Sequence, residues 1–158
     1  MNMSKLFKIA AAVGLLAFVV MQFFRPARTN PTSDPSVSFE AVVKPPQEVV
    51  SSLKRACNDC HSNQTVWPWY SNIAPVSWLV ASDVNEGRVH LNFSNWMQPG
   101  AEGEKPEVSE LCEQVKVGKM PLRAYTLLHP QAKLTDQEVA GLCALPGGEA
   151  RAEVPEPR

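Results

Sequence analysis

The sequence contains few of the residues that build regular β-sheets or bind nucleic acids. Aromatic residues make up only 8% of the 158 residues, two of them are tyrosines, and 14 residues are prolines. No strict alternation of apolar and polar residues runs long enough to indicate a strand. From Pro31 onward the chain has 11 basic and 16 acidic residues, which gives a net charge of −5. It lacks the clustered lysines and arginines that binding to nucleic-acid phosphates requires. The composition therefore predicts a small, mostly α-helical domain rich in loops, and no nucleic-acid partner.

The N-terminal segment carries a long hydrophobic run. From Leu6 to Phe24, 19 residues are apolar apart from Lys8 and Gln22, and as a helix they cover about 28 Å, close to one membrane core. The run ends in bulky residues and lacks a small-x-small cleavage site, which favours a retained membrane anchor over a cleaved signal. We expect an anchor or signal over residues 1–25, a Pro-rich tether over 26–45, a folded domain over 46–146 and a disordered tail over 147–158.

The chemistry of the chain centres on the motif Cys57-Asn58-Asp59-Cys60-His61. This C-x-x-C-H pattern is typical of c-type haem attachment, in which two thiols add to the vinyl groups of one haem and the adjacent imidazole binds the iron. Residues three apart share one face of a helix, so both sulfurs meet the same haem edge. The pattern predicts one covalent haem c on Cys57 and Cys60, with His61 as an axial iron ligand. An apolar stripe predicts a helix that ends at the motif (Val49, Val50, Leu53, Ala56).

Three other uses of these cysteines fit less well. A thioredoxin-like redox pair normally opens a helix after a strand, and no strand pattern precedes Cys57. A zinc site needs four ligands, and the sequence has no second ligand pair at short spacing. A disulfide between Cys57 and Cys60 leaves the adjacent His61 without a role.

The motif also sets the expected orientation in the membrane. Charge does not decide it, because Lys5 and Lys8 on one side of the apolar run balance Arg25 and Arg28 on the other. Thioether attachment in bacteria takes place outside the cytoplasmic membrane. We therefore expect an inner-membrane protein whose haem domain faces the periplasm.

A second axial ligand is expected from Met120, which lies in a Gly-Lys-Met-Pro loop before the last predicted helix. A thioether is a soft, neutral donor that favours ferrous iron and raises the reduction potential. His129 is an alternative that gives bis-histidine ligation. His90 and Met97 reach the iron only if their segment folds over the haem face, and an open axial position is a further possibility.

Three more helices follow from periodicity and capping signals. Pro75 suits the first turn of a helix that runs to about Glu86, with Gly87 as its stop. A second is expected over residues 107–117, and a third begins at Thr135, where Glu138 completes a capping box. On the apolar faces of these last two helices lie two further cysteines, Cys112 and Cys143, which either form a disulfide or remain buried free thiols.

Several large side chains near the motif are candidates for the haem pocket. A porphyrin offers a wide apolar face, so core aromatics of a small domain tend to lie against it, although plain core filling explains them equally well. Arg88 suits a haem propionate, or it is an ordinary surface arginine. The aromatic candidates are Trp67, Trp69, Tyr70 and Trp78.

Several multi-residue motifs in order resemble the bacterial haem-binding domain family of small membrane-anchored cytochromes. The similarity covers roughly residues 46–145 and implies a monohaem c-type domain with an electron-transfer role. The motifs are Cys57–Asn63, Trp67–Ser71, Ile73–Leu79, Glu86–Arg88, Leu91–Trp96 and Gly118–Leu122, followed by Tyr125, Leu128–Pro130, Ala132 and Leu134.

These observations predict a cytochrome c-like helical domain around one haem, behind an N-terminal transmembrane helix. The favoured function is a tethered single-electron carrier that meets redox partner proteins near the membrane and need not be an enzyme. A peroxidase-like enzyme or a sensor of small gases or redox state is the alternative, and it requires an open axial position. Reversible haem storage fits poorly, because the predicted attachment is covalent.

Overall fold

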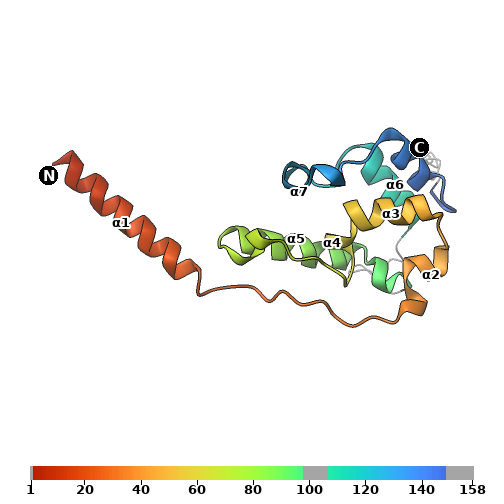
Figure 1. Cartoon of the computed structure of the whole chain (residues 1–158), viewed down its shortest axis with the longest axis horizontal. Coiled ribbons are helices and arrows are strands. Elements are labelled where there is room, and N and C mark those ends of the chain that lie inside the picture. The colour runs from red at the N-terminus through yellow and green to blue at the C-terminus, as the bar shows by residue number, and fades with distance from the viewer. Residues whose placement is uncertain (1, 98–106, 149–158) are drawn as a thin grey trace, which may run out of the picture.

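The structure is a computed structural model that describes residues 2–97 and 107–148 (Figure 1). Within those ranges it contains helices and no strand, which confirms the mostly α-helical prediction. The α-helices are α1 (Met3–Met21), α2 (Phe39–Val43), α3 (Gln47–Ala56), α4 (Asn58–His61), α5 (Val76–His90), α6 (Val108–Lys116), α7 (Arg123–Leu128) and α8 (Asp136–Cys143). Short 3-10 helices are η1 (Pro35–Val37), η2 (Trp69–Asn72), η3 (Phe93–Asn95) and η4 (Pro130–Ala132).

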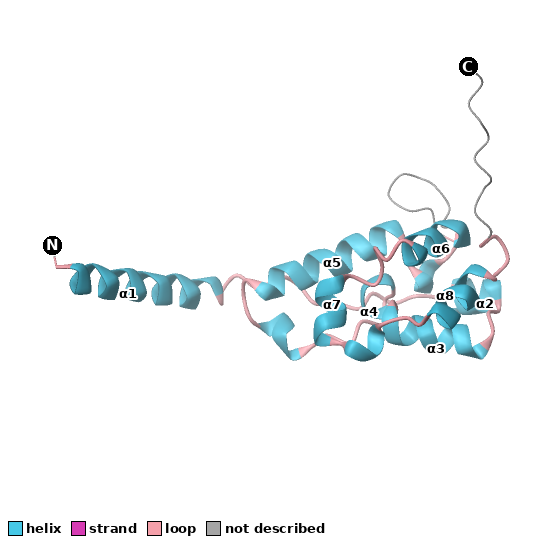
Figure 2. Cartoon of the chain, turned by 90° about the horizontal axis from the view of Figure 1, so that it is seen from above, coloured by secondary structure: helices cyan, strands magenta, loops and turns pink. Residues whose placement is uncertain are grey.

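Helix α1 extends away from the other helices, and none of its residues is buried (Figures 1 and 2). It is long and apolar enough to cross a membrane, as the hydrophobic run predicted. Its bounds lie three residues before the expected ones. The helix ends because the chain turns at Gln22, whose side chain binds the Phe18 carbonyl within α1 and the distant Ala74 carbonyl.

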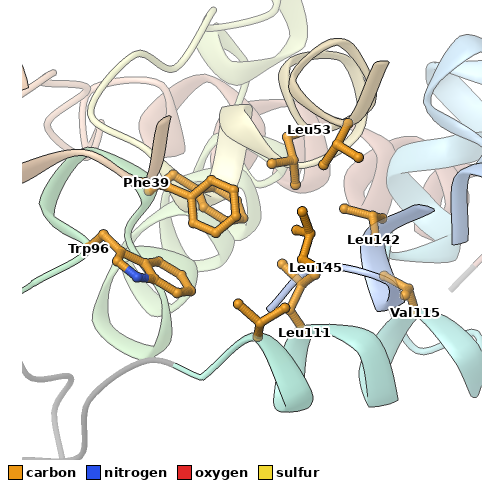
Figure 3. Close-up of a cluster of buried hydrophobic side chains, with 10 residues drawn as sticks. Phe39, Leu53, Trp96, Leu111, Val115, Leu142 and Leu145 are labelled. Atoms are coloured by element: carbon orange, nitrogen blue, oxygen red, sulfur yellow. The ribbon is translucent and has the colours of Figure 1, made fainter. Parts of the chain in front are cut away.

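The core lies where α3, α6 and α8 meet, and aromatic residues close it at one end. Each helix contributes the apolar face that its 3.6-residue period predicted, and α6 and α8 pack directly on each other. The side chains labelled in Figure 3 point toward one another: Phe39, Leu53, Trp96, Leu111, Val115, Leu142 and Leu145.

The folded domain begins earlier than the expected boundary at residue 46. Phe39 opens α2, is only 1% exposed and packs edge-on against Phe93 and Trp96 at ring-centroid distances of 5.3 and 4.6 Å. Ser38 starts this short helix by accepting a hydrogen bond from the Ala41 amide. The segment from Ser38 to Val43 therefore packs on the other helices.

Helix α8 is tied to α3 at its first turn. Thr135 and Glu138 form the predicted capping box. The Glu138 carboxylate also accepts hydrogen bonds from Ser52 and from Arg55, the latter at 2.6 Å, on α3. The capping residues thus also fix how the two helices dock.

A disulfide joins Cys112 on α6 to Cys143 on α8, across 31 residues of sequence. Cys112 is 2% exposed and Cys143 packs against the core, so the disulfide lies beside the core residues. Of the two states left open by the sequence, the structure has the bonded one.

Helix α5 runs through Gly87 to His90, so Gly87 is not the helix stop that the sequence predicted. The glycine is needed for packing. A Cβ atom at this position would lie 2.7 Å from the backbone oxygen of Cys60. The absence of a side chain lets α5 rest directly on the backbone of α4, which lies between α3 and α5 (Figure 2).

Candidate functional site

The motif consists of Cys57, which follows the last residue of α3, and the single turn of α4. The backbone amide of Cys57 donates to Leu53 in α3, and the amides of Cys60 and His61 both donate to the carbonyl of Cys57 at 3.1 and 2.9 Å. This geometry sets the two thiols and the imidazole within a single helical turn. Cys57 and Cys60 are both free thiols and do not form a disulfide with each other.

The imidazole of His61 is held in one orientation by the backbone of α5. Its Nδ1 atom lies 3.0 Å from the carbonyl oxygens of both Gly87 and Leu91. Carbonyl oxygens only accept, so Nδ1 carries the proton and Nε2 keeps its lone pair. Burial lowers the pKa of His61, which favours this neutral form despite the two hydrogen bonds. His61 is thereby prepared to bind a metal ion through Nε2.

The two motif thiols are held in their neutral form. Burial raises the pKa of Cys57 to about 12, and the nearby Cys60 adds to the effect. Burial raises the pKa of Cys60 to about 11, with further contributions from Asp83 and Asp59. Neither thiol has the lowered pKa of a redox-active C-x-x-C pair, so the site does not resemble a thioredoxin-like centre.

Asp59, a variable position of the motif, connects α4 to two other segments. Its carboxylate accepts a hydrogen bond from the Val66 amide at 2.9 Å and another from the Tyr125 hydroxyl at 2.8 Å. Its backbone carbonyl accepts from the Thr65 hydroxyl at 2.7 Å. No sequence pattern indicated this role, and the only local signal was an acidic residue inside the motif.

Tyr125 begins an aromatic network that includes His129. The two rings stack with centroids 4.4 Å apart, and His129 Nε2 lies 2.7 Å from the hydroxyl of Tyr70. The other ring nitrogen of His129 lies 3.4 Å from the side-chain amide of Gln131. Both nitrogens of the alternative axial ligand therefore have partners within the protein.

Met120 contacts the hydrophobic core. Its side chain is partly buried and packs against the cluster of buried apolar residues on which Cys57 also packs. Its backbone amide donates to the Gln114 carbonyl at the end of α6, which fixes the loop. By contrast, Met97 is 52% exposed, and His90 is exposed at the end of α5.

The aromatic candidates have different surroundings. Trp67 is partly buried, and its indole N–H has no hydrogen-bond partner among residues 2–97 and 107–148, so it is an available donor. Tyr70 is engaged with His129. Trp69 is 75% exposed, and the indole N–H of Trp78 donates to the carbonyl of Phe24 just beyond α1. Of the four candidates, Trp69 is largely exposed, and Tyr70 and Trp78 form hydrogen bonds within the protein.

Arg88 makes contacts within the protein through all three guanidinium nitrogens. Nε donates to the Ser62 carbonyl, Nη1 to the Thr29 carbonyl, and Nη2 to the side chains of Asn30 and Thr65, all at 2.8–2.9 Å. These contacts bind the segment after α1 to the loop that follows the motif. The arginine therefore acts as a connector between the two.

A family model described as a haem-binding domain matches residues 16–145, which is more than half of the 158 residues. No curated protein and no solved structure matches the chain. The match begins inside α1 and includes the motif, the network around Asp59 and the Met120 loop.

Proposed function

The chain belongs to the haem-binding domain family, and from that premise we propose that it is a membrane-anchored c-type cytochrome that carries single electrons. The observation that supports this most is the prepared His61 beside two free thiols in one helical turn. These three groups are the donor set that covalent haem attachment requires. The available N–H of Trp67 is a suitable donor for a carboxylate of the cofactor.

Attachment uses the chemistry of the neutral thiols. Cys57 and Cys60 would hold the haem through thioether bonds, for which each S–H would add across one vinyl group, its sulfur bonding to one vinyl carbon and its hydrogen to the other. This addition consumes no oxidant. The raised pKa values of Cys57 and Cys60 are compatible with it, because the protonated thiol supplies both atoms.

His61 is the proposed first axial ligand and Met120 the second. The fixed Nδ1 proton leaves Nε2 of His61 for the iron. Met120 is favoured over His129 because its thioether is partly buried beside the motif's core, whereas both nitrogens of His129 have protein partners. When bound, the haem iron supplies one-electron redox chemistry. With His61 and Met120 both bound, the iron would have no open position for a substrate, which favours a carrier over an enzyme or gas sensor.

The proposed location is the cytoplasmic membrane of a bacterium, with the haem domain on the periplasmic side. Helix α1 provides the span, and among residues 2–97 and 107–148 no other helix is long and apolar enough to cross a membrane. Attachment of haem to Cys57 and Cys60 takes place on the outer side of that membrane, which fixes the orientation.

The test is whether haem stays on the chain after denaturation. Acid acetone should leave haem on the purified wild type, and Cys57→Ala or Cys60→Ala should strongly reduce the yield of holoprotein. The matched control is the double variant Cys112→Ala/Cys143→Ala, which removes two cysteines outside the motif and should keep its haem covalently bound. Extraction of haem from the wild type would refute covalent attachment. Rapid binding of carbon monoxide by the native protein would refute the two-ligand carrier.

A further inference from the structure

The end of the domain nearest α1 exposes an unusual number of large apolar side chains. Trp69 is 75% exposed and Leu79 is 65% exposed. We define the apolar cap as the exposed side chains contributed by the segment after α1, by η2 and by the start of α5. Its members are Phe24, Trp69, Ile73, Val76, Trp78 and Leu79. Single exposed apolar residues are ordinary, but a contiguous group marks a contact surface.

The cap is fixed directly to the end of the membrane helix. Gln22, one residue after α1, pairs its side-chain amide with the backbone of Ala74, donating at 3.1 Å and accepting at 3.0 Å. The indole N–H of Trp78 donates to the carbonyl of Phe24 at 2.6 Å. Because Gln22 directly follows the last residue of α1 and one residue spans less than about 4 Å, these contacts hold Ala74 near the end of that helix. Figures 1 and 2 both show the start of α5 as the domain end nearest α1.

The charge pattern around the cap fits a lipid surface. No charged residue occurs between His61 and Asp83, a stretch that includes all of η2 and the first half of α5. The nearest charges from the segment after α1 are both positive, Arg25 and Arg28, and Arg28 donates to the Ser71 hydroxyl in η2. Tryptophan at the membrane interface with arginine beside it is the usual arrangement at the end of a spanning helix. Acidic residues appear in α5 only from Asp83 onward.

From these observations we propose that the apolar cap sits in the interfacial layer of the bilayer that α1 spans, so that the domain is seated on the membrane rather than free on a tether. The partner is the lipid surface itself, including anionic headgroups near Arg25 and Arg28. The inference rests on the proposal that α1 is a membrane span. It is independent of the identity of the axial ligands.

The segment that follows α1 supports this seating. Residues 22, 24, 28, 29 and 30 each make at least one hydrogen bond to the domain, to Ala74, Trp78, Ser71 and Arg88 among others. A free linker would make no such series of contacts. Few residues remain between this docked segment and η1 to permit large swings.

The experiment is photo-crosslinking of the full-length holoprotein in phosphatidylcholine nanodiscs that contain phosphatidylglycerol. The probe is a phosphatidylcholine with a diazirine in its acyl chain near the glycerol, and adducts are mapped by peptide mass spectrometry. Lipid adducts are expected on α1 and on the peptide that contains Trp69 and Leu79. They should be several-fold rarer on α2, which carries the exposed Val42 at the opposite end of the domain (Figures 1 and 2).

A variant links the seating to the hydrogen bonds that hold it. Gln22→Ala combined with Trp78→Phe removes the three hydrogen bonds that join the segment after α1 to Ala74 and Trp78, while keeping an aromatic ring in the cap. Cap adducts should fall several-fold, and α1 adducts should stay unchanged. Gln137→Ala is the matched control, because Gln137 is exposed on α8, far from the cap in sequence, and should change neither.

Adducts on α1 but not on the cap would overturn the seating and leave the membrane anchor intact. An absence of adducts on α1 would refute the anchor itself, and thereby the location proposed for the protein. Cap adducts that persist at full level in the double variant would overturn the role of the hydrogen bonds at the end of α1.

Discussion

The contact between Gly87 and the motif allows a prediction whose sign depends on one distance. Replacing a glycine inside a helix by alanine normally stabilises a protein by about 0.5 to 1 kcal/mol, because the unfolded chain loses entropy. At Gly87, however, the new Cβ would lie 2.7 Å from the Cys60 oxygen and 3.1 Å from its carbon. Backbone atoms cannot rotate away as a flexible side chain can, so α5 and α4 must separate.

Overpacking of this kind costs about 1 to 3 kcal/mol, which exceeds the entropic gain. Gly87→Ala should therefore destabilise the holoprotein by about 1 to 2 kcal/mol in net terms and lower Tm by several degrees. The assay is urea unfolding of the holoprotein followed by far-UV circular dichroism, with the midpoint compared at constant m. The separation should also weaken the hydrogen bond from His61 to the Gly87 carbonyl.

Gly141 provides the matched control within α8. A Cβ at this position would lie 3.7 Å from Cγ2 of Val49, an ordinary van der Waals contact. Gly141→Ala should thus raise stability by about 0.5 to 1 kcal/mol, as expected for an unstrained helical site. A Gly87→Ala variant as stable as the wild type, or an equal loss of stability in both variants, would contradict the close packing of Gly87 on Cys60.

Three further predictions concern the iron ligand, the disulfide and the link between α3 and α8. Met120→Ala should abolish the weak methionine-to-iron charge-transfer band, give a high-spin ferric spectrum and allow carbon monoxide to bind the iron. His129→Ala should leave the band, the spin state and the carbon monoxide binding nearly unchanged. The reverse pattern would assign the second iron ligand to His129. Replacing Cys112 and Cys143 by alanine should lower the free energy of unfolding, measured in urea, by about 3 to 4 kcal/mol on the chain-entropy model. Two reactive thiols in the denatured, unreduced wild type would contradict the disulfide. The hydrogen bond from the Thr135 backbone amide, together with other partners, lowers the pKa of Glu138 below its ordinary 4.5. The carboxylate therefore stabilises the fold fully above pH 4.5, and this stabilisation is lost as the pH falls through the lowered pKa. Glu138→Gln should reduce the dependence of the unfolding free energy on pH in this acidic range.

Local sequence signals were sufficient for the helices that supply the core. The stripe of Val49, Val50, Leu53 and Ala56 identified α3 because each helical turn presents one apolar residue to the same side. The capping box at Thr135 identified the start of α8, because it satisfies orphan amides within four residues. Signals of this kind need no knowledge of the rest of the fold.

Contacts between distant residues were not predictable in the same way. Gly87 looked like a helix stop because its real role, close packing on Cys60, depends on a segment 27 residues earlier. Phe39 lay among prolines in a five-residue helix, too short to show a period. The carboxylate of Asp59 binds Tyr125 across 66 residues, and nothing near either residue indicates the pairing.

The proposed seating of the domain would change how the proposed electron carrier meets its partners. A free tether would let every face of the domain reach the membrane surface in turn. With the apolar cap held against the bilayer, one end is covered and partners approach from the sides or the opposite end. From Pro31 onward the chain carries a net charge of −5, whereas Arg25 and Arg28 next to the cap are both positive. Long-range electrostatic attraction then favours partners with a basic surface that approach from the aqueous side.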